Sequence, residues 1–570
     1  MSSNPPKIEV KNHGFGQIDF IIEVLRKMKV DKILDKALTK EGHAPEIPYG
    51  VTGMLFIANI ICAQEPLYNM NEIFDDEYVY DFKGSFGIDI TLDQLNDDRF
   101  GLFLDRVFEA GCKEIFTKIM VEAMTTFSIK LSHVNYDTTS KTMWGAYHTP
   151  EGSKVSELEV EYGYNKQKRH DKKQLVLALG MSGGVAVSAE VLSGNMNDKT
   201  FNTDNIERFK ELNGILTTHD EAELYYIADS AAATSKTFKK AEELDVKLIT
   251  RLPDNCLLTK SMVTKWLPRW HEGNDISIPK INKAEESHYR IFEDAGNHDG
   301  TALKTTLCFS MNLVNQKYHT LEKKRDREKE QLTELMKKSE RTSTFACEED
   351  ALKWIKETKK VQGKKLGYHE LNFEILEVKQ KAPGRQPKDE SKQKYKTKYD
   401  VKLSFKEMEN LMDILMQLTI KESLFMLVSN DLNLTGEEIL RQYKTQSSVE
   451  VKFQQFKSKH FANSLFVKKI ERVESLMFMY LIGLQACTII EHVIRRGLES
   501  ENDFIVGRGK TKQYRPTFRT IITRFRKIGR QIINFDGQEI RQLSPNINDD
   551  LLKMLRYLDI DLENFKGRYI

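Results

Sequence analysis

The chain has 570 residues, of which 40% are hydrophobic and 30% are charged, and its formal net charge is only +2. This length exceeds one compact domain and predicts roughly two to four domains with apolar cores of their own. Its six cysteines are scattered and form no Cys-x-x-Cys pair. A zinc ribbon and a disulfide framework are therefore disfavoured, and a reducing cytosol fits best.

The sequence offers no candidate membrane span. The first ten residues, MSSNPPKIEV, lack the basic and then apolar pattern of a secretory signal. The longest apolar stretch, 476–490, has about fifteen residues, fewer than the roughly 20 that span a bilayer, and Gln485 interrupts it. We expect a buried helix there and no membrane partner.

Apolar residues recur at helical spacing through 1–128, as in IDFIIEVLRKMKVDKILDKAL, and predict a helical N-terminal region. From residue 129 the pattern changes to short β-branched and aromatic runs. For 129–254 it predicts three strands, a helix, a strand, a helix and a strand. This order is typical of a mixed α/β sheet.

The α/β pattern is interrupted at 255–435, where several predicted strands accompany a long charged helix. Within this block, 379–400 is basic and polar with two prolines, and we expect a loop or flexible segment. Residues 436–500 are predicted to be helical, and 501–570 helical and basic. The block at 255–435 therefore separates two parts of the chain that are expected to fold together.

Three acids stand where a sheet of this kind places functional groups. Asp137 is expected at the end of the first strand, Asp229 at the end of a later strand and Glu450 on a helix. Carboxylates at strand ends face the crevice in which α/β sheets bind ligands, and Mg²⁺ prefers such oxygen ligands. The plain alternatives are a turn residue, a helix cap and a solvated surface glutamate.

The stretch YKTQSSVEVKFQQFK, read as one helix, aligns four polar side chains on one stripe: Tyr443, Gln446, Glu450 and Lys457. One interpretation is a face that handles phosphate. The alternative is a solvated amphipathic helix with four apolar side chains packing inward: Val449, Val451, Phe453 and Phe456.

Taken together, these segments resemble DDE transposases of bacterial insertion sequences, in the superfamily with the signature Tyr-x2-Arg-x3-Glu-x6-Lys. Its spacing is matched by Tyr443, Glu450 and Lys457, and Gln446 stands where Arg is usual. The contexts VNYDTTS and YIADSAAAT resemble those of the first two acids. GYNKQKRHDKKQLVLAL, VLSGNMNDKTF and LNDDRFGLFLDRVFEAG are also similar to family segments.

The resemblance implies an RNase H-like catalytic fold, with an insertion domain at 255–435 between the second Asp and the Glu. It implies that Asp137, Asp229 and Glu450 hold two Mg²⁺ ions, for which Mn²⁺ substitutes. The implied reaction frees a 3′-hydroxyl at each element end and joins it to target DNA. A non-catalytic DNA-binding relative of transposases remains the alternative.

The resemblance also implies partners. These are double-stranded DNA, as terminal inverted repeats and as target, and a second copy of the chain in the DNA complex. The helical region 1–128 is expected to bind the element ends. The implied location is the bacterial cytoplasm, with association to the nucleoid through DNA.

Phosphate contacts are expected beside the acids. Lys457 would pair with a backbone phosphate and Tyr443 would donate a hydrogen bond to one. Gln446 carries no charge, so its contact would be weaker than that of Arg. The loop before the second predicted strand adds three cations, which form either a phosphate track or a solvated loop: Lys166, Lys168 and Arg169.

Two further features fit DNA. Trp266 and Trp270 in WLPRW would stack on a flipped base, although core packing is the more common role of such side chains. Nine Lys or Arg and no acid lie between Phe504 and Phe535. This basic run is expected either to contact the DNA backbone or to be a solvated helix face. Four apolar residues would face the protein: Phe518, Ile521, Ile522 and Phe525.

Overall fold

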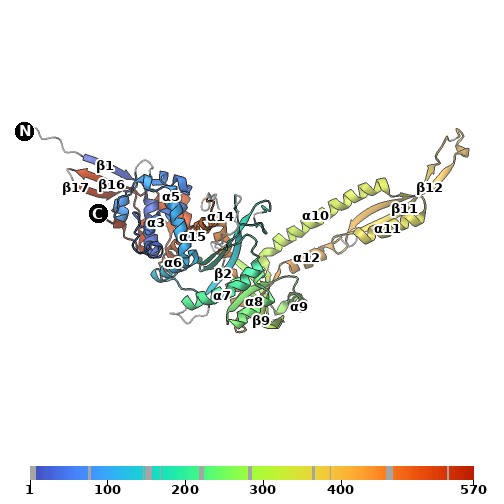
Figure 1. The fold of residues 1–570 in the computed structure, drawn as a ribbon. Helices are drawn as coiled ribbons and strands as arrows, with labels where there is room; N and C mark the ends of the chain where they lie inside the picture. The colour runs from blue at the N-terminus through green and yellow to red at the C-terminus, as the bar shows by residue number, and fades with distance from the viewer. Residues whose placement is uncertain are drawn as a thin grey trace, which may run out of the picture. The chain divides into compact units, whose positions relative to one another are not determined.

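The computed structural model describes residues 8–569 (Figure 1), apart from 75–78, 145–146, 148–156, 167, 217–223, 280–284, 363–365, 386, 458–466 and 536–537. The chain divides into two compact units. The first comprises Met1–Pro253, Ala295–Lys304 and Val428–Ile570, and the second comprises Asp254–Asp294 and Thr305–Leu427.

The first unit contains a mixed sheet with the strand order β4-β3-β2-β5-β6. Its strands are β2 (His133–Thr142), β3 (Gln174–Ser182), β4 (Val185–Leu192), β5 (Tyr225–Ala228) and β6 (Lys247–Leu252). The first three are antiparallel neighbours, whereas β5 runs parallel to β2 and β6 runs parallel to β5. This is the RNase H-like arrangement, and the predicted fold class is confirmed.

The local sequence explains the sheet. All nine residues of β3 are buried, as expected for the uninterrupted apolar run QLVLALGMS. Gly183 and Gly184 join β3 to β4 with φ of 54° and 84°, the left-handed conformation that a two-residue hairpin turn requires at both positions. The crossovers are helical: α7 (Asp198–Leu216) precedes β5, and α8 (Ser235–Glu243) joins β5 to β6.

Helix α15 (Ile470–Ser500) is the core helix of the first unit. It packs against β4 and three N-terminal helices: α3 (Tyr49–Cys62), α5 (Asp97–Ala110) and α6 (Cys112–Thr126). Its length and composition would allow it to cross a membrane, but 94% of its most apolar window is buried inside this fold. The side chain of Gln485, which interrupts the apolar run, donates to the carbonyl of Ala186 at 3.1 Å. The predicted buried helix at 476–490 is confirmed.

The helical predictions for 1–128 and 501–570 hold only in part, because both regions also contain strands. Strand β1 (Ile8–His13) pairs with β16 (Arg530–Phe535), which pairs with β17 (Gln538–Leu543), so the two ends of the chain share one sheet (Figure 1). The remaining N-terminal helices are α1 (Gly16–Lys27), α2 (Val30–Leu38) and α4 (Phe82–Phe86). The C-terminal part adds β14 (Ile505–Val506), β15 (Lys512–Gln513), α16 (Phe518–Phe525) and α17 (Asp549–Tyr557).

The second unit carries most of the interrupting block. Its helices are α9 (Leu257–Trp266), α10 (Met311–Thr342), α11 (Glu348–Gln362) and α12 (Leu411–Glu422). Its strands include β7 (Asn274–Pro279), β11 (His369–Lys381) and β12 (Tyr395–Glu407). Strands β8 (Glu286–His298), β9 (Thr301–Ser310) and β13 (Leu424–Ser429) include residues of both units.

The prediction of a loop throughout 379–400 is wrong at both ends of that segment. Lys379–Lys381 belong to β11 and Tyr395–Asp400 to β12, and the two strands pair in register, for example Lys381 with Tyr395. Main-chain hydrogen bonds sustain this ladder, so a polar sequence does not prevent it. The loop itself is confined to 382–394.

Candidate active site

Asp137 lies on β2, and its side chain is 22% exposed. The prediction that the strand ends here is wrong, because Thr138–Thr142 continue the antiparallel pairing with β3. The parallel pairing of β2 with β5 does stop at this point, at the pair Tyr136 and Ala228. Asp137 therefore marks the edge of the parallel ladder.

Asp229 follows directly on β5, as predicted, and is exposed. Its carboxylate caps the short helix Ser230–Ala232 and accepts a hydrogen bond from the Ala231 N–H at 2.9 Å. Because Ala228 pairs with Tyr136, Asp229 and Asp137 follow paired residues on adjacent strands, whose backbones lie about 4.8 Å apart. The sheet thus brings the first two predicted acids together.

Glu450 is exposed in the first turn of α14 (Ser447–Lys457), where a carboxylate is favourable at the positive end of the helix dipole. The prediction of one helix from Tyr443 to Lys457 is wrong. Tyr443 belongs to α13 (Gly436–Lys444), and Thr445 and Gln446 separate the two helices. The Thr445 hydroxyl donates to the carbonyl of Gln442 at 2.6 Å and also bonds to Asn135.

The inward face of α14 differs from the predicted one. Val449 and Phe453 are buried, but Val451 is 53% exposed. Lys452 is buried instead and forms an ion pair with Glu491 of α15. The side chains of Phe456 and Lys457 lie outside the described residues.

Two hydrogen bonds hold the start of α14 against β2. The Asn135 side-chain amide donates to the Thr445 hydroxyl at 2.8 Å, and the Gln446 amide donates to the carbonyl of Tyr136 at 2.8 Å. Gln446 is only 8% exposed. Glu450 lies in the first turn of α14, four residues after Gln446, so this clamp fixes the start of the helix that carries it.

The negative charges of all three predicted acids affect the pKa of the Tyr443 phenol. The pKa of Tyr443 is raised to about 12, mainly by burial; the positive charge of Arg251 opposes the rise, and the negative charges of Asp229, Glu450 and Asp137 add to it. The charges of all three predicted acids therefore act in the same direction on this phenol. Tyr443 stays protonated at neutral pH, so its hydroxyl can donate a hydrogen bond.

Lys166 lies against the first acid. Its ammonium donates to the Thr138 carbonyl at 2.6 Å and is 3.6 Å from an oxygen of Asp137 and 3.4 Å from one of Asp198. Partial burial would lower the pKa of Lys166, but the charges of Asp137 and Asp198 raise it overall. Thr138, Lys166 and Asp198 border a cavity of about 270 Å³.

Asp198 is a fourth acid that the sequence interpretation missed. It is the first residue of α7 and accepts a hydrogen bond from the Thr138 hydroxyl at 2.5 Å. The local sequence VLSGNMNDKTF indicates only that Asp198 begins a helix, where an acidic residue is common. The only signal was its place in a segment that already resembled the family.

Burial raises the pKa of Asp137 to about 6. The positive charge of Lys166 and the Thr138 N–H oppose this rise, and the negative charges of Asp229 and Asp198 add to it. A carboxylate in this setting is short of positive charge. The arrangement is typical of a site that is completed by a cation.

Asp137 and Asp229 could provide part of the ligand set of a Mg²⁺ ion. Among the described residues, no three His, Cys, Asp or Glu side chains converge closely enough to enclose a metal ion. Mg²⁺, however, is usually held by one or two carboxylates together with substrate phosphate oxygens and water. Asp137 and Asp229 on adjacent strands offer such a partial set of hard oxygen donors.

Comparison with known families decides what kind of domain carries this site. Residues 141–484, more than half of the chain, match the family described as transposase DDE domain. The chain belongs to the DDE transposase family. Its DDE domain includes Asp229 and Glu450, and the matched range begins four residues after Asp137.

Other comparisons add context. Residues 11–121 match a domain of unknown function, DUF4277. No curated protein matches the chain. Among solved structures, the chain is similar to a piggyBac transposase in a synaptic complex with hairpin DNA. The identity is 9%, with 90% of this chain and 78% of that chain covered, at a TM-score of 0.35.

The predicted phosphate track divides in two. Lys166 faces the acids of the DDE domain, as described above, whereas Lys168 is exposed. Arg169 forms a two-pronged pair with Asp171, at 2.8 and 2.9 Å, and its guanidinium lies 5.2 Å from the ring centre of Trp144. The DNA contacts of these residues remain predictions.

The two tryptophans belong to the second unit and are half-buried. Trp266 lies 5.5 Å from the ring of Phe292, and Trp270 lies 4.8 Å from that of Phe309. Both therefore pack in an aromatic cluster, as the alternative interpretation expected. Base stacking by Trp266 or Trp270 remains a prediction.

Proposed function

We propose that the chain is the transposase of a bacterial insertion sequence, in the superfamily with the signature Tyr-x2-Arg-x3-Glu-x6-Lys. It would cut the ends of its element and join the freed 3′-hydroxyls to target DNA. One observation carries this proposal: Asp137, four residues before the matched DDE domain, and Asp229, within it, follow paired residues on adjacent strands, and the helix of Glu450 is clamped to the same strand as Asp137.

Asp137, Asp229 and Glu450 would hold two Mg²⁺ ions, or Mn²⁺ in their place. When bound, such ions activate the attacking oxygen and stabilise the leaving oxygen of a phosphodiester displacement. Asp198 lies beside this set through its bond to Thr138 and would orient the strand rather than contact the scissile phosphate.

The protein's own residues would position the DNA. Tyr443, protonated at neutral pH, would donate a hydrogen bond to a non-bridging oxygen of the scissile phosphate. The Lys457 ammonium would pair with a neighbouring phosphate. Gln446 is engaged with the carbonyl of Tyr136, so it would act by holding α14 in place.

The proposed chemistry has two displacements. In the first, water attacks the phosphorus at the element end, the bond to the 3′-oxygen breaks, and that oxygen takes up a proton to become a free hydroxyl. In the second, this 3′-hydroxyl loses its proton and attacks a phosphodiester of the target, which releases a target 3′-oxygen. Neither step needs a covalent protein intermediate or an oxidant.

The substrates would be duplex DNA with terminal inverted repeats and target duplex DNA. Two ends must be cut and joined together, so a homodimer in the DNA complex is part of the proposal. The protein would work in the bacterial cytoplasm, at the nucleoid. Inverted repeats next to the coding frame, flanked by short direct repeats, would be the genomic counterpart.

The test is a cleavage assay with purified full-length chain and a labelled duplex that carries the flanking inverted repeat. In Mg²⁺ or Mn²⁺ we expect a nick at the repeat boundary that leaves a 3′-hydroxyl, and no nick in EDTA. The variants Asp137→Asn and Asp229→Asn should bind the duplex but leave it intact. Binding without cleavage by the native chain would instead establish a non-catalytic relative.

A further inference from the structure

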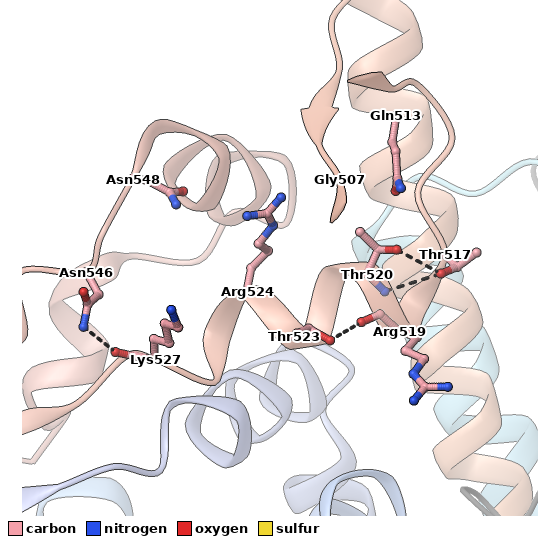
Figure 2. A pocket seen from close by; sticks show the side chains of 10 residues that line it. All are labelled: Gly507, Gln513, Thr517, Arg519, Thr520, Thr523, Arg524, Lys527, Asn546 and Asn548. Carbon is pink, nitrogen blue, oxygen red and sulfur yellow. Dashed lines mark hydrogen bonds between the residues drawn. The ribbon is translucent and has the colours of Figure 1, made fainter. Parts of the chain in front are cut away.

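A polar cleft of about 700 Å³ lies over the outward face of α16 in the first unit (Figure 2). Three segments line it: the β14–β15 hairpin, α16 with its flanks, and the turn before α17. The lining residues are Gly507, Gln513, Thr517, Arg519, Thr520, Thr523, Arg524, Lys527, Asn546 and Asn548. This part of the chain lies outside both matched family ranges.

The lining is chemically uniform. Three of its ten residues are cations, and the others, apart from Gly507, carry hydroxyl or amide groups. Hydroxyls, amides and cations are the groups that contact DNA phosphates. Small-molecule pockets are lined mainly by apolar side chains, and sites for single-stranded nucleic acid by aromatic side chains on which bases stack. The ten lining residues include no apolar and no aromatic side chain.

The floor of the cleft is firmly anchored. Its inward face is buried through four side chains: Phe518, Ile521, Ile522 and Phe525. The ring of Phe525 stacks on that of Phe20, with centroids 3.7 Å apart, so α16 is fixed to α1. The predicted inward orientation of these apolar residues is confirmed, and the opposite face of α16 is left to the cleft.

The three cations of the cleft come from α16 and the turn after it. Arg519 lies in α16 and Lys527 in the turn that follows the helix, and both line the cleft. Figure 2 shows the side chains of Arg524, in α16, and Lys527, in the turn after it, on the side of Asn548 and Asn546. Neither the Arg519 guanidinium nor the Lys527 ammonium forms an ion pair with a described residue.

Arg524 is oriented from the other wall. Its guanidinium lies 3.9 Å from a carboxylate oxygen of Asp550 in α17. The same oxygen accepts a hydrogen bond from the N–H of Val506 in the hairpin at 2.9 Å. One carboxylate therefore connects α17, the hairpin and the central cation, so the three walls are tied together before any ligand arrives.

We propose that this cleft binds the phosphate backbone of double-stranded DNA, with Arg519 and Lys527 as the principal phosphate contacts. The inference rests on the proposed function, because it assigns a second DNA contact to the same protein, away from the acids. Recognition is by charge and hydrogen bonding to phosphates, so it is independent of base sequence.

The test is fluorescence anisotropy with a labelled DNA duplex, the matched single strand and inorganic phosphate as competitor, over a salt series. The double variant Arg519→Gln/Lys527→Gln should bind the duplex roughly tenfold more weakly, and its salt slope should fall by about 2. The control Arg526→Gln/Lys510→Gln removes two exposed cations of the same basic run that do not line the cleft. It should leave affinity and slope nearly unchanged.

A second measurement uses the unaltered chain. Mass spectrometry after acetylation of lysines should show Lys527 protected by duplex DNA but not by single-stranded DNA or phosphate, while Lys510 stays reactive. Equal loss of affinity in both double variants, no loss in either, or preference for the single strand would overturn the inference. If the native chain binds duplex through this cleft but does not cut it, the proposed function fails and the inference stands.

Discussion

The side-chain amide of Gln446 donates a 2.8 Å hydrogen bond to the main-chain carbonyl of Tyr136, the residue before Asp137. The two residues are 310 positions apart, so this bond closes a very long loop through the interrupting block. It connects the strand of the first acid to the start of the helix that carries the third. Gln446 thus acts within the protein, through a contact with the main chain of β2.

This relationship predicts the effect of Gln446→Ala. The variant leaves the Tyr136 carbonyl buried without its donor, which should cost about 1–2 kcal/mol in the free energy of unfolding. Cleavage should fall because α14 is no longer held against β2, whereas the Kd for duplex DNA should stay unchanged. Urea denaturation and anisotropy check both points. A raised Kd with normal stability would instead indicate a direct phosphate contact by Gln446.

We predict that Lys166 partly balances the negative charges of Asp137 and Asp198 when no metal ion is bound. In Lys166→Met, Asp137 and Asp198 lose their nearest cation, so the Tm in EDTA should fall. Mg²⁺ should then raise the Tm more in the variant than in the native chain, because the ion replaces the missing positive charge. Thermal unfolding with and without Mg²⁺ measures this, and Lys199→Met is the control, since Lys199 is exposed and borders the same cavity. Equal Mg²⁺ effects in both variants would contradict the prediction.

Asp137 should make the free energy of unfolding of the metal-free chain depend on pH. Its pKa is raised from 3.8 to about 6, so the folded chain holds a proton between these values that the unfolded chain has released. The contribution of Asp137 to stability therefore falls as pH rises through this window. In EDTA, Asp137→Asn should be more stable than the native chain above pH 6, by up to about 3 kcal/mol, with no difference below about pH 4.

Asp171→Asn is the matched control for that measurement. Asp171 is an exposed carboxylate whose pKa is lowered to about 2 by its hydrogen bonds with Arg169, so the substitution should not stabilise the fold at any pH. Denaturant unfolding at pH 4, 5, 6, 7 and 8 distinguishes the variants. A native chain as stable as Asp137→Asn at pH 7 would refute the claim that Asp137 is short of positive charge.

The buried pair of Lys452 and Glu491 should hold α14 on α15. The Lys452 and Glu491 side chains are 7% and 6% exposed, and Glu491 also accepts from the Phe518 N–H at 2.6 Å. Lys452→Met leaves Glu491 with Arg495, 3.4 Å away, as its remaining cation, and should cost about 3 kcal/mol in unfolding free energy. Arg441→Met, which breaks an exposed pair with Glu437, should cost less than about 1 kcal/mol.

The central strands were predictable because their signals are local. β-Branched and apolar runs with a Gly-Gly turn define β3 and β4, and Asp229 follows the run YYIA directly. The break between α13 and α14 was not predictable, since it depends on the bonds of Thr445 and Gln446 to residues of β2. No periodicity within 443–457 carries that information.

Two further misses have the same cause. Strand β1 has a largely exposed, alternating sequence, and only its pairing with β16, more than 500 residues later, makes it a strand. Asp198 has the local pattern of a helix start, and only folding brings it to Thr138 and Lys166. Asp229 was identified because it directly follows a strand, and Asp137 because it lies on the adjacent strand where the parallel pairing stops.

The most direct measurement compares Glu450→Gln with Glu437→Gln in the cleavage assay at saturating DNA and Mg²⁺. Both are glutamates in the first turn of adjacent helices, but only Glu450 belongs to the proposed metal-binding set with Asp137 and Asp229. The account predicts that Glu450→Gln lowers the cleavage rate at least about 10³-fold with unchanged DNA binding, whereas Glu437→Gln cleaves like the native chain. Native-like cleavage by Glu450→Gln would contradict the assignment of the third acid and with it the proposed site.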